Sequence, residues 1–95
     1  MVDLKPGQLV RSLAGRDKGK HYLVLQELDE KYVLLVDGRR RPVARPKKKN
    51  KAHLQHYERG AEFEAPFDPD EVTDNQVIES LKRLVPVTGD SEEEV

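Results

Sequence analysis

The densest chemistry in this sequence is a run of cations between Arg39 and Lys51. Eight of these thirteen residues are Arg or Lys, and no acid interrupts them. Guanidinium groups grip phosphate oxygens through paired hydrogen bonds, and ammonium groups attract them as point charges. The run therefore indicates a site for a polyanion, whose binding would weaken as salt rises. Its cations are Arg39, Arg40, Arg41, Arg45, Lys47, Lys48, Lys49 and Lys51.

A second, smaller group of cations comprises Arg16, Lys18 and Lys20. We expect their loop to lie near the longer run, so that both make one basic face. Asn50 and His53 join the predicted site, because an amide can bond a base edge or a 2′-hydroxyl and an imidazole can stack on a base.

Structural interpretations stand beside each of these assignments. Cations along an exposed strand protect its edge from pairing with another chain. The smaller group is equally typical of an ordinary polar hairpin loop, and Asn50 is typical of a turn. Each alternative predicts the same residue types, so the sequence leaves them open.

No constellation for catalysis or for a cofactor is present. The chain has no cysteine, which excludes disulfides, thiolate metal sites and a cysteine nucleophile. His53 and His56 lack a third ligand at useful spacing, so we expect no metal. The sequence also has no serine–histidine–acid set and no phosphate-binding glycine loop. We therefore expect a binding protein rather than an enzyme.

The net charge of −1 conceals a strong asymmetry along the chain. Residues 1–59 carry fifteen cations and seven acids, whereas residues 60–95 carry two cations and eleven acids. Such a division predicts a charged partner for the basic part. The acidic part is expected to be a solvated tail or an internal competitor that folds over the basic face. No apolar run is long enough to cross a bilayer, and we expect a cytoplasmic monomer.

Short β-rich segments separated by turn signals must position these cations. We expect a polar hairpin loop at 15–20, where two glycines can take positive φ, and a tight hairpin turn at Asp37-Gly38. Pro42 makes the fourth segment an edge or interrupted strand, and 45–50 is expected to be a basic loop. The expected strands are 8–12, 22–25, 32–36, 39–43 and 53–57.

A single helix is expected after the strands. Thr73 to Gln76 matches a capping box, apolar residues follow at helical spacing, and Pro86 ends the pattern. The helix is predicted over 74–84. The expected fold is mostly β, a small closed barrel of about five short strands, on which the helix packs unless it docks on a partner.

The segment from Gly7 to Val24 resembles a KOW motif, which is a strand, a basic glycine-bearing loop and a second strand. Gly15-Arg16-Asp17-Lys18-Gly19-Lys20 carries most of the match. The stretches 36–43 and 46–54 extend it, because they are similar to short bacterial KOW proteins related to the large-subunit ribosomal protein fourteen family of eukaryotes and archaea.

This resemblance implies an SH3-like barrel that binds RNA, most plausibly ribosomal RNA, without catalysis. It implies the ribosome, and ribosomal or transcription proteins, as partners. The alternative is a protein-interaction KOW module, with the strand edge and the helix face Val77–Val85 as its contact surface. The expected organisation is a barrel over 1–59, an acidic linker over 60–72, the helix over 73–86 and a disordered acidic tail over 87–95.

Overall fold

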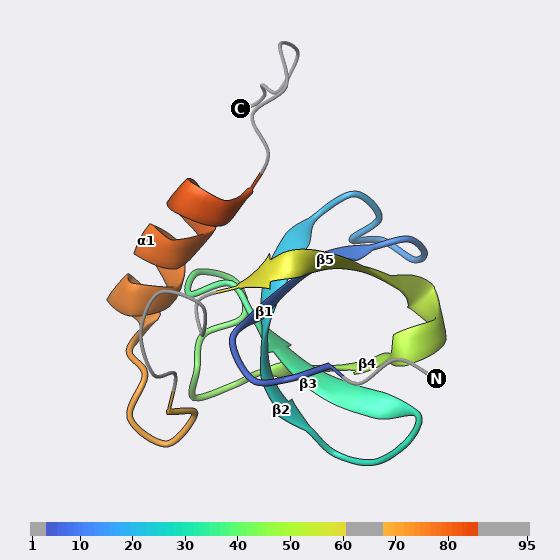
Figure 1. Ribbon diagram of the computed structural model, residues 1–95, viewed down its shortest axis with the longest axis horizontal. Coiled ribbons are helices and arrows are strands. Elements are labelled where there is room, and N and C mark those ends of the chain that lie inside the picture. Colours follow the sequence, from blue (N-terminus) through green and yellow to red (C-terminus); the bar gives the residue numbers. More distant parts are fainter. Residues whose placement is uncertain (1–3, 61–67, 86–95) are drawn as a thin grey trace, which may run out of the picture.

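Five antiparallel strands form a curled half-barrel with one helix beside it, as a computed structural model shows for residues 4–60 and 68–85 (Figure 1). The strand order is β4-β3-β2-β1-β5. A short 3₁₀ turn, η1 (Lys51–His53), joins the two outer strands. The strands are β1 (Gln8–Ser12), β2 (His21–Glu27), β3 (Tyr32–Val36), β4 (Lys47–Asn50) and β5 (Leu54–Gly60). This is the mostly β architecture expected, and it is compatible with a small SH3-like barrel, but β4 and β5 are the two edges of the described sheet and do not pair to close it.

Both faces of the central strands are buried, as the continuous apolar runs predict. Successive side chains of a strand point to opposite faces, and the two faces hold two separate apolar clusters. Leu9 and Leu23 belong to the cluster that the helix covers. Val10 and Val24 belong to the cluster on the other face of the sheet. Because β1, β2 and β3 place apolar side chains in both clusters, the register between these strands is firmly specified.

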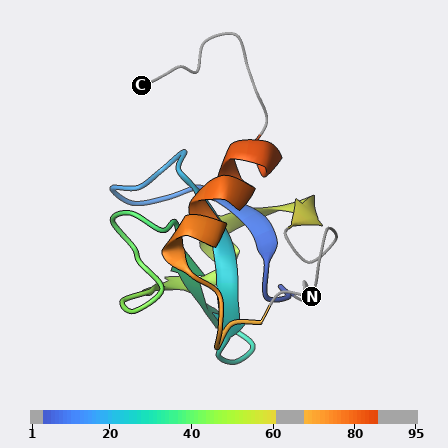
Figure 2. The same cartoon turned by 90° about the vertical axis from the view of Figure 1, so that its left-hand side faces the viewer.

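Helix α1 (Asp74–Leu84) begins and ends where the sequence predicts. The Thr73 hydroxyl accepts a hydrogen bond from the Gln76 backbone N–H, and the Gln76 side chain accepts one from the Thr73 N–H, which completes the capping box. Val77 and Leu84 are buried in the first apolar cluster. Of the two alternatives for this helix, packing on the sheet is therefore the one observed (Figure 2).

The third connection differs from the prediction. Residues 39–43 form no strand, and the fourth strand is instead the lysine-rich segment 47–50, which was expected to be a loop. The prediction of a tight hairpin turn at Asp37-Gly38 is likewise wrong. Residues 37–46 form a longer connection, after which β4 pairs with β3. Lysine has a low intrinsic preference for strands, so propensity alone did not predict this segment. Pairing of Lys47 and Lys48 with Leu35 and Leu34 of β3 places it in the sheet.

The 15–20 loop and the strand at 32–36 are confirmed, and the strands predicted at 22–25 and 53–57 are present with shifted bounds, since β2 is longer at both ends and His53 belongs to η1 rather than to β5. Gly15 and Gly19 have φ values of 89° and 91°. Leu54 packs against the second apolar cluster, whereas His53 and His56 are exposed. The predicted tail at 87–95 and most of the predicted linker lie outside the described residues, and so do residues 61–67 and 86–95 of the acidic part expected to compete for the basic face.

Candidate polyanion interface

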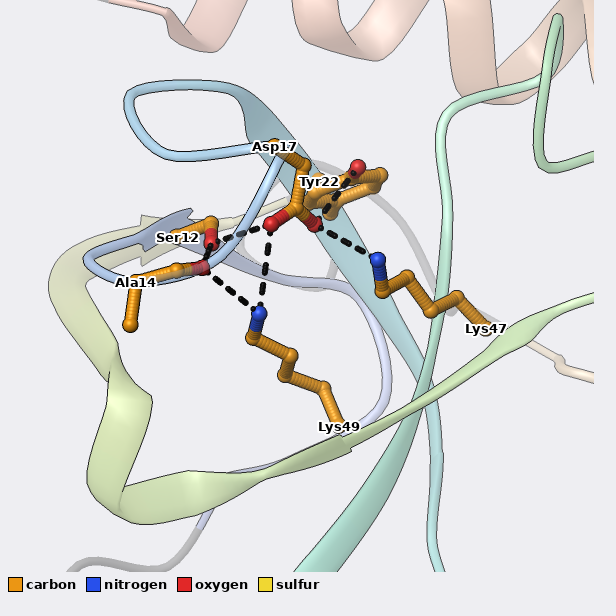
Figure 3. A network of polar contacts seen from close by, with 6 residues as sticks. All are labelled: Ser12, Ala14, Asp17, Tyr22, Lys47 and Lys49. Carbon is orange, nitrogen blue, oxygen red and sulfur yellow. Dashed lines mark hydrogen bonds and ion pairs between the residues drawn. The ribbon is translucent and has the colours of Figure 1, made fainter.

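The carboxylate of Asp17 is the centre of a buried polar network (Figure 3). Asp17 lies in the β1–β2 loop and is 6% exposed. The Ser12 hydroxyl donates to its Oδ1 over 2.8 Å, and the Tyr22 hydroxyl donates to its Oδ2 over 3.0 Å. Two ammonium groups of β4 complete the site. Lys47 Nζ lies 3.1 Å from Oδ2, and Lys49 Nζ lies 3.2 Å from Oδ1.

These contacts strongly favour the ionised form of Asp17. Burial alone would raise the pKa of this carboxyl group, because it penalises a charge removed from water. Hydrogen bonds from Ser12, Lys47, Lys49 and Tyr22 outweigh that penalty and hold the pKa well below its usual value. Burial raises the pKa of the Tyr22 hydroxyl, and its bond to Asp17 raises it further. The network therefore holds one carboxylate between two ammonium groups at neutral pH.

The lysines of β4 are consequently engaged within the fold. The Lys49 side chain is only 10% exposed and also donates to the Ala14 carbonyl oxygen over 2.9 Å. Lys48 Nζ lies 4.5 Å from the centre of the Tyr32 ring, a cation–π contact. Lys51 pairs with Glu27. Each of the four lysines between Lys47 and Lys51 thus has an intramolecular partner.

Asn50 also has an internal role. Its side-chain oxygen accepts a hydrogen bond from the Ala52 N–H and caps η1, so the turn interpretation describes its contacts. His53 ends η1 with an exposed side chain, and its carbonyl oxygen accepts a bond from the Leu13 N–H.

The arginines of the β3–β4 connection differ from the lysines of β4. We call residues 37–46 the arginine loop. Within the part of the chain that the structure describes, no ion pair or side-chain hydrogen bond engages its four guanidinium groups. All four side chains are exposed to solvent. They are Arg39, Arg40, Arg41 and Arg45.

The backbone of the arginine loop is nevertheless well ordered by hydrogen bonds. The Asp37 carboxylate accepts from the N–H groups of Arg39 and Arg41 over 2.8 and 2.9 Å. The Asp37 N–H donates to the Arg41 carbonyl oxygen over 3.0 Å, and the Arg45 N–H donates to the Pro42 carbonyl oxygen over 2.9 Å. The arginines therefore project from a folded loop rather than from a loose tail.

The β1–β2 loop presents its cations in a similar way. Arg16, Lys18 and Lys20 are exposed, and no ion pair engages them among residues 4–60 and 68–85. Asp17, which lies between them, turns inward and reaches β4 just after the arginine loop. Both loops extend toward the same side of the molecule in Figure 2. The structure thus brings the β1–β2 loop beside Lys47 and Lys49 of the longer group, with Asp17 at the junction, whereas Lys51 pairs with Glu27 at the far end of β2.

Asp17 is the important residue that sequence reasoning missed. It was included in a polar hairpin loop and given no contact of its own. The signal was a lone acid among cations, since such a carboxylate has several ammonium groups within reach. Its burial depends on the distant strand β4, which the sequence did not predict.

Comparison with known proteins identifies no relative, because neither a protein-family model nor a curated protein matches the chain. Among the described residues, no helix is long and apolar enough to cross a membrane. The same residues contain no group of three or more side chains that could hold a metal ion. The candidate site is thus defined by charge and geometry alone.

Proposed function

We propose that this protein is an RNA-binding module that contacts folded RNA through the exposed cations of two loops. The observation that carries the proposal is the separation between engaged and available cations. The β4 lysines have partners inside the fold, while the arginine loop and the β1–β2 loop present seven cations that make no ion pair within the described residues. Their positive charge is therefore available to an external polyanion.

Arginine suits this role better than lysine would. A guanidinium group offers planar, paired donors to a phosphate and can also stack on a base. The arginine loop holds three such groups in succession on a backbone that Asp37 orders. The resemblance to KOW proteins supports ribosomal RNA as the ligand, since the strand–loop–strand unit from β1 to β2 carries the residues of that resemblance.

The alternative of a protein-interaction module receives less support. It relied partly on the apolar face of α1 as a contact surface. Val77 and Leu84 on that face are buried against the sheet, so that they are unavailable to a partner in this arrangement. No described feature favours this alternative over RNA.

Titration against ribosomal RNA fragments at several salt concentrations tests the proposal. Each neutralised phosphate should contribute about −0.7 to −0.9 to the slope of log affinity against log salt. Tight binding at low salt with a slope of about −3 or steeper would support it. An absence of binding at low salt, or retention of a protein partner after nuclease treatment with no RNA affinity, would contradict it.

A further inference from the structure

The arginine loop is attached to the beginning of helix α1. The Val43 N–H donates a hydrogen bond of 2.7 Å to Asp74 Oδ1, between residues 31 positions apart in the chain. Val43 itself packs against the apolar cluster beneath the helix. A loop that extends from the β3–β4 end of the sheet is therefore tied to an element made much later in the sequence.

A second contact supports the same loop at Gly38. A Cβ atom at this position would lie 2.7 Å from the Asp74 carbonyl oxygen and 2.7 Å from Cγ1 of Ile78. The backbone of Gly38 thus lies directly against the first turns of α1. Its φ of 81° also belongs to the region that favours glycine. Arg39, Arg40 and Arg41 follow Gly38 directly in the chain. The contact of Gly38 with α1 therefore fixes the point at which this arginine segment begins to extend away from the helix.

The Asp74 carboxylate is not required to cap its own helix. Thr73 and Gln76 form the complete capping box between them. Asp74 still benefits from its place in the first turn, where the helix dipole favours a negative charge. Among the described residues, the hydrogen-bond donor to this carboxylate is the Val43 N–H of the arginine loop.

We infer that Asp74 is a positioning residue for the arginine loop, and that α1 fixes this loop so that the protein prefers folded RNA over a flexible polyanion. The inference rests on the proposed function. A loop held in one shape loses little conformational freedom on binding. It can match phosphates whose spacing is also fixed, as in an RNA hairpin. A flexible single-stranded RNA can adapt its phosphates to any arrangement of cations, so a fixed loop should raise its affinity little.

Three variants test this role in the full chain. Asp74→Ala removes the acceptor, while Asp74→Asn keeps a side-chain oxygen in place and removes the charge. Asn75→Ala is the matched control, because Asn75 lies exposed in the same helical turn and makes no side-chain hydrogen bond to another described residue. The ligands are an RNA hairpin and a uridine oligonucleotide of equal length, and thermal melting confirms that each variant is folded.

The expected result is selective. Asp74→Ala should bind the hairpin roughly three- to tenfold more weakly, as expected for loss of one partly buried hydrogen bond, and should bind the oligonucleotide unchanged. Asp74→Asn and Asn75→Ala should match the unaltered protein. Exchange of the Val43 amide hydrogen should accelerate in Asp74→Ala only, which reports loop release without reference to RNA.

Other outcomes overturn the inference in distinguishable ways. If the unaltered protein binds neither RNA, the proposed function fails and the inference fails with it. If it binds the hairpin and Asp74→Ala binds equally well, only the positioning role fails. If Asp74→Ala and Asp74→Asn both bind more tightly, the carboxylate acts merely by repelling phosphate, and the positioning role is again wrong.

A glycine pair provides an independent test. Gly38→Ala should displace the loop from α1 and weaken hairpin binding selectively. Gly7→Ala introduces a side chain at a similar φ of 92° and lies outside both cation loops, so it controls for backbone strain. If both variants fold and bind the hairpin with equal affinity, the inference is contradicted.

Discussion

Strand β4 and the arginine loop are adjacent in the chain and carry charges of the same sign, yet the cations of β4 contact the fold and those of the loop face solvent. The β4 lysines approach a carboxylate, a carbonyl oxygen and an aromatic ring of the same chain. The arginines extend into solvent from an ordered loop. This contrast shows that density of charge alone does not identify a binding surface. What decides is whether the fold supplies acceptors for that charge.

The largest effect should follow from removing the charge at the junction of these two regions. Asp17→Asn leaves Lys47 and Lys49 close together without their shared counterion. We expect the free energy of unfolding to fall by about 3 kcal/mol, as is typical when one partner of a buried ion pair is lost. Urea denaturation measures this loss. Asp70→Asn, which changes an exposed carboxyl group, should leave stability nearly unchanged; an equal loss in both variants would contradict the buried role.

Acidification should remove the same contribution from the unaltered protein. The pKa of Asp17 is lowered in the folded state, where hydrogen bonds from Ser12, Lys47, Lys49 and Tyr22 overcome the effect of burial. Its stabilisation is thus complete above the unfolded pKa of about 4 and is lost as pH falls toward the folded value. Denaturation curves should show the unfolding free energies of the unaltered protein and of Asp17→Asn converging as pH falls below about 4. A stability difference that stayed constant to pH 2 would be incompatible with this assignment.

Neutralising the arginine loop should affect RNA and spare the fold. The combined replacement Arg39→Gln, Arg40→Gln and Arg41→Gln removes three exposed cations. We expect affinity for a ribosomal RNA fragment to fall roughly 10- to 50-fold at low salt and the salt slope to flatten by about 2 to 3. Filter binding across salt measures both. Unchanged affinity with unchanged stability would mean that these side chains are not the interface.

The opposite pattern is expected for a β4 lysine. Lys49→Met keeps the length of the side chain but removes its bonds to Ala14 and Asp17. We expect a stability loss of about 1 to 2 kcal/mol, because an acceptor is left without its charged donor. RNA affinity per folded molecule should change less than twofold. A large drop in affinity without a loss of stability would place Lys49 in the interface and erase the distinction between the two regions.

The smallest effect should come from the ring beneath Lys48. Tyr32→Leu retains an apolar side chain on β3 but removes the aromatic face. We expect a loss of about 0.5 kcal/mol, the usual contribution of a cation–π contact that solvent still reaches. Thermal melting of this variant and of Lys48→Met would measure the contact, and the double variant should lose less than the sum of the two.

Local patterns predicted much of this fold. The bounds of β1 and α1 follow from alternation, the capping box and Pro86, all of which act within a few residues. The β3–β4 connection escaped prediction because its determinants are distant. Lys47 to Asn50 become a strand through pairing with β3 and contact with Asp17, and residues 39–43 become a loop through Asp37 and Asp74.

The candidate site was predicted as a composition rather than as a geometry. The cations named from the sequence lie in the two loops, along β4 and in η1, but the sequence could not separate lysines with internal partners from exposed arginines. That separation depends on where Asp17 and Glu27 lie in space. Asn50 shows the same limit, since an amide suited to RNA also suits the capping of a turn.

The bond between Val43 and Asp74 has a consequence for the order in which the protein is made. A ribosome synthesises the arginine loop before it synthesises the first turn of α1, because 31 positions separate the two residues. The nascent chain therefore contains its arginines before it contains the residue that fixes their arrangement. Selective recognition would arise only when translation has passed Asp74 and the helix has folded back onto the sheet.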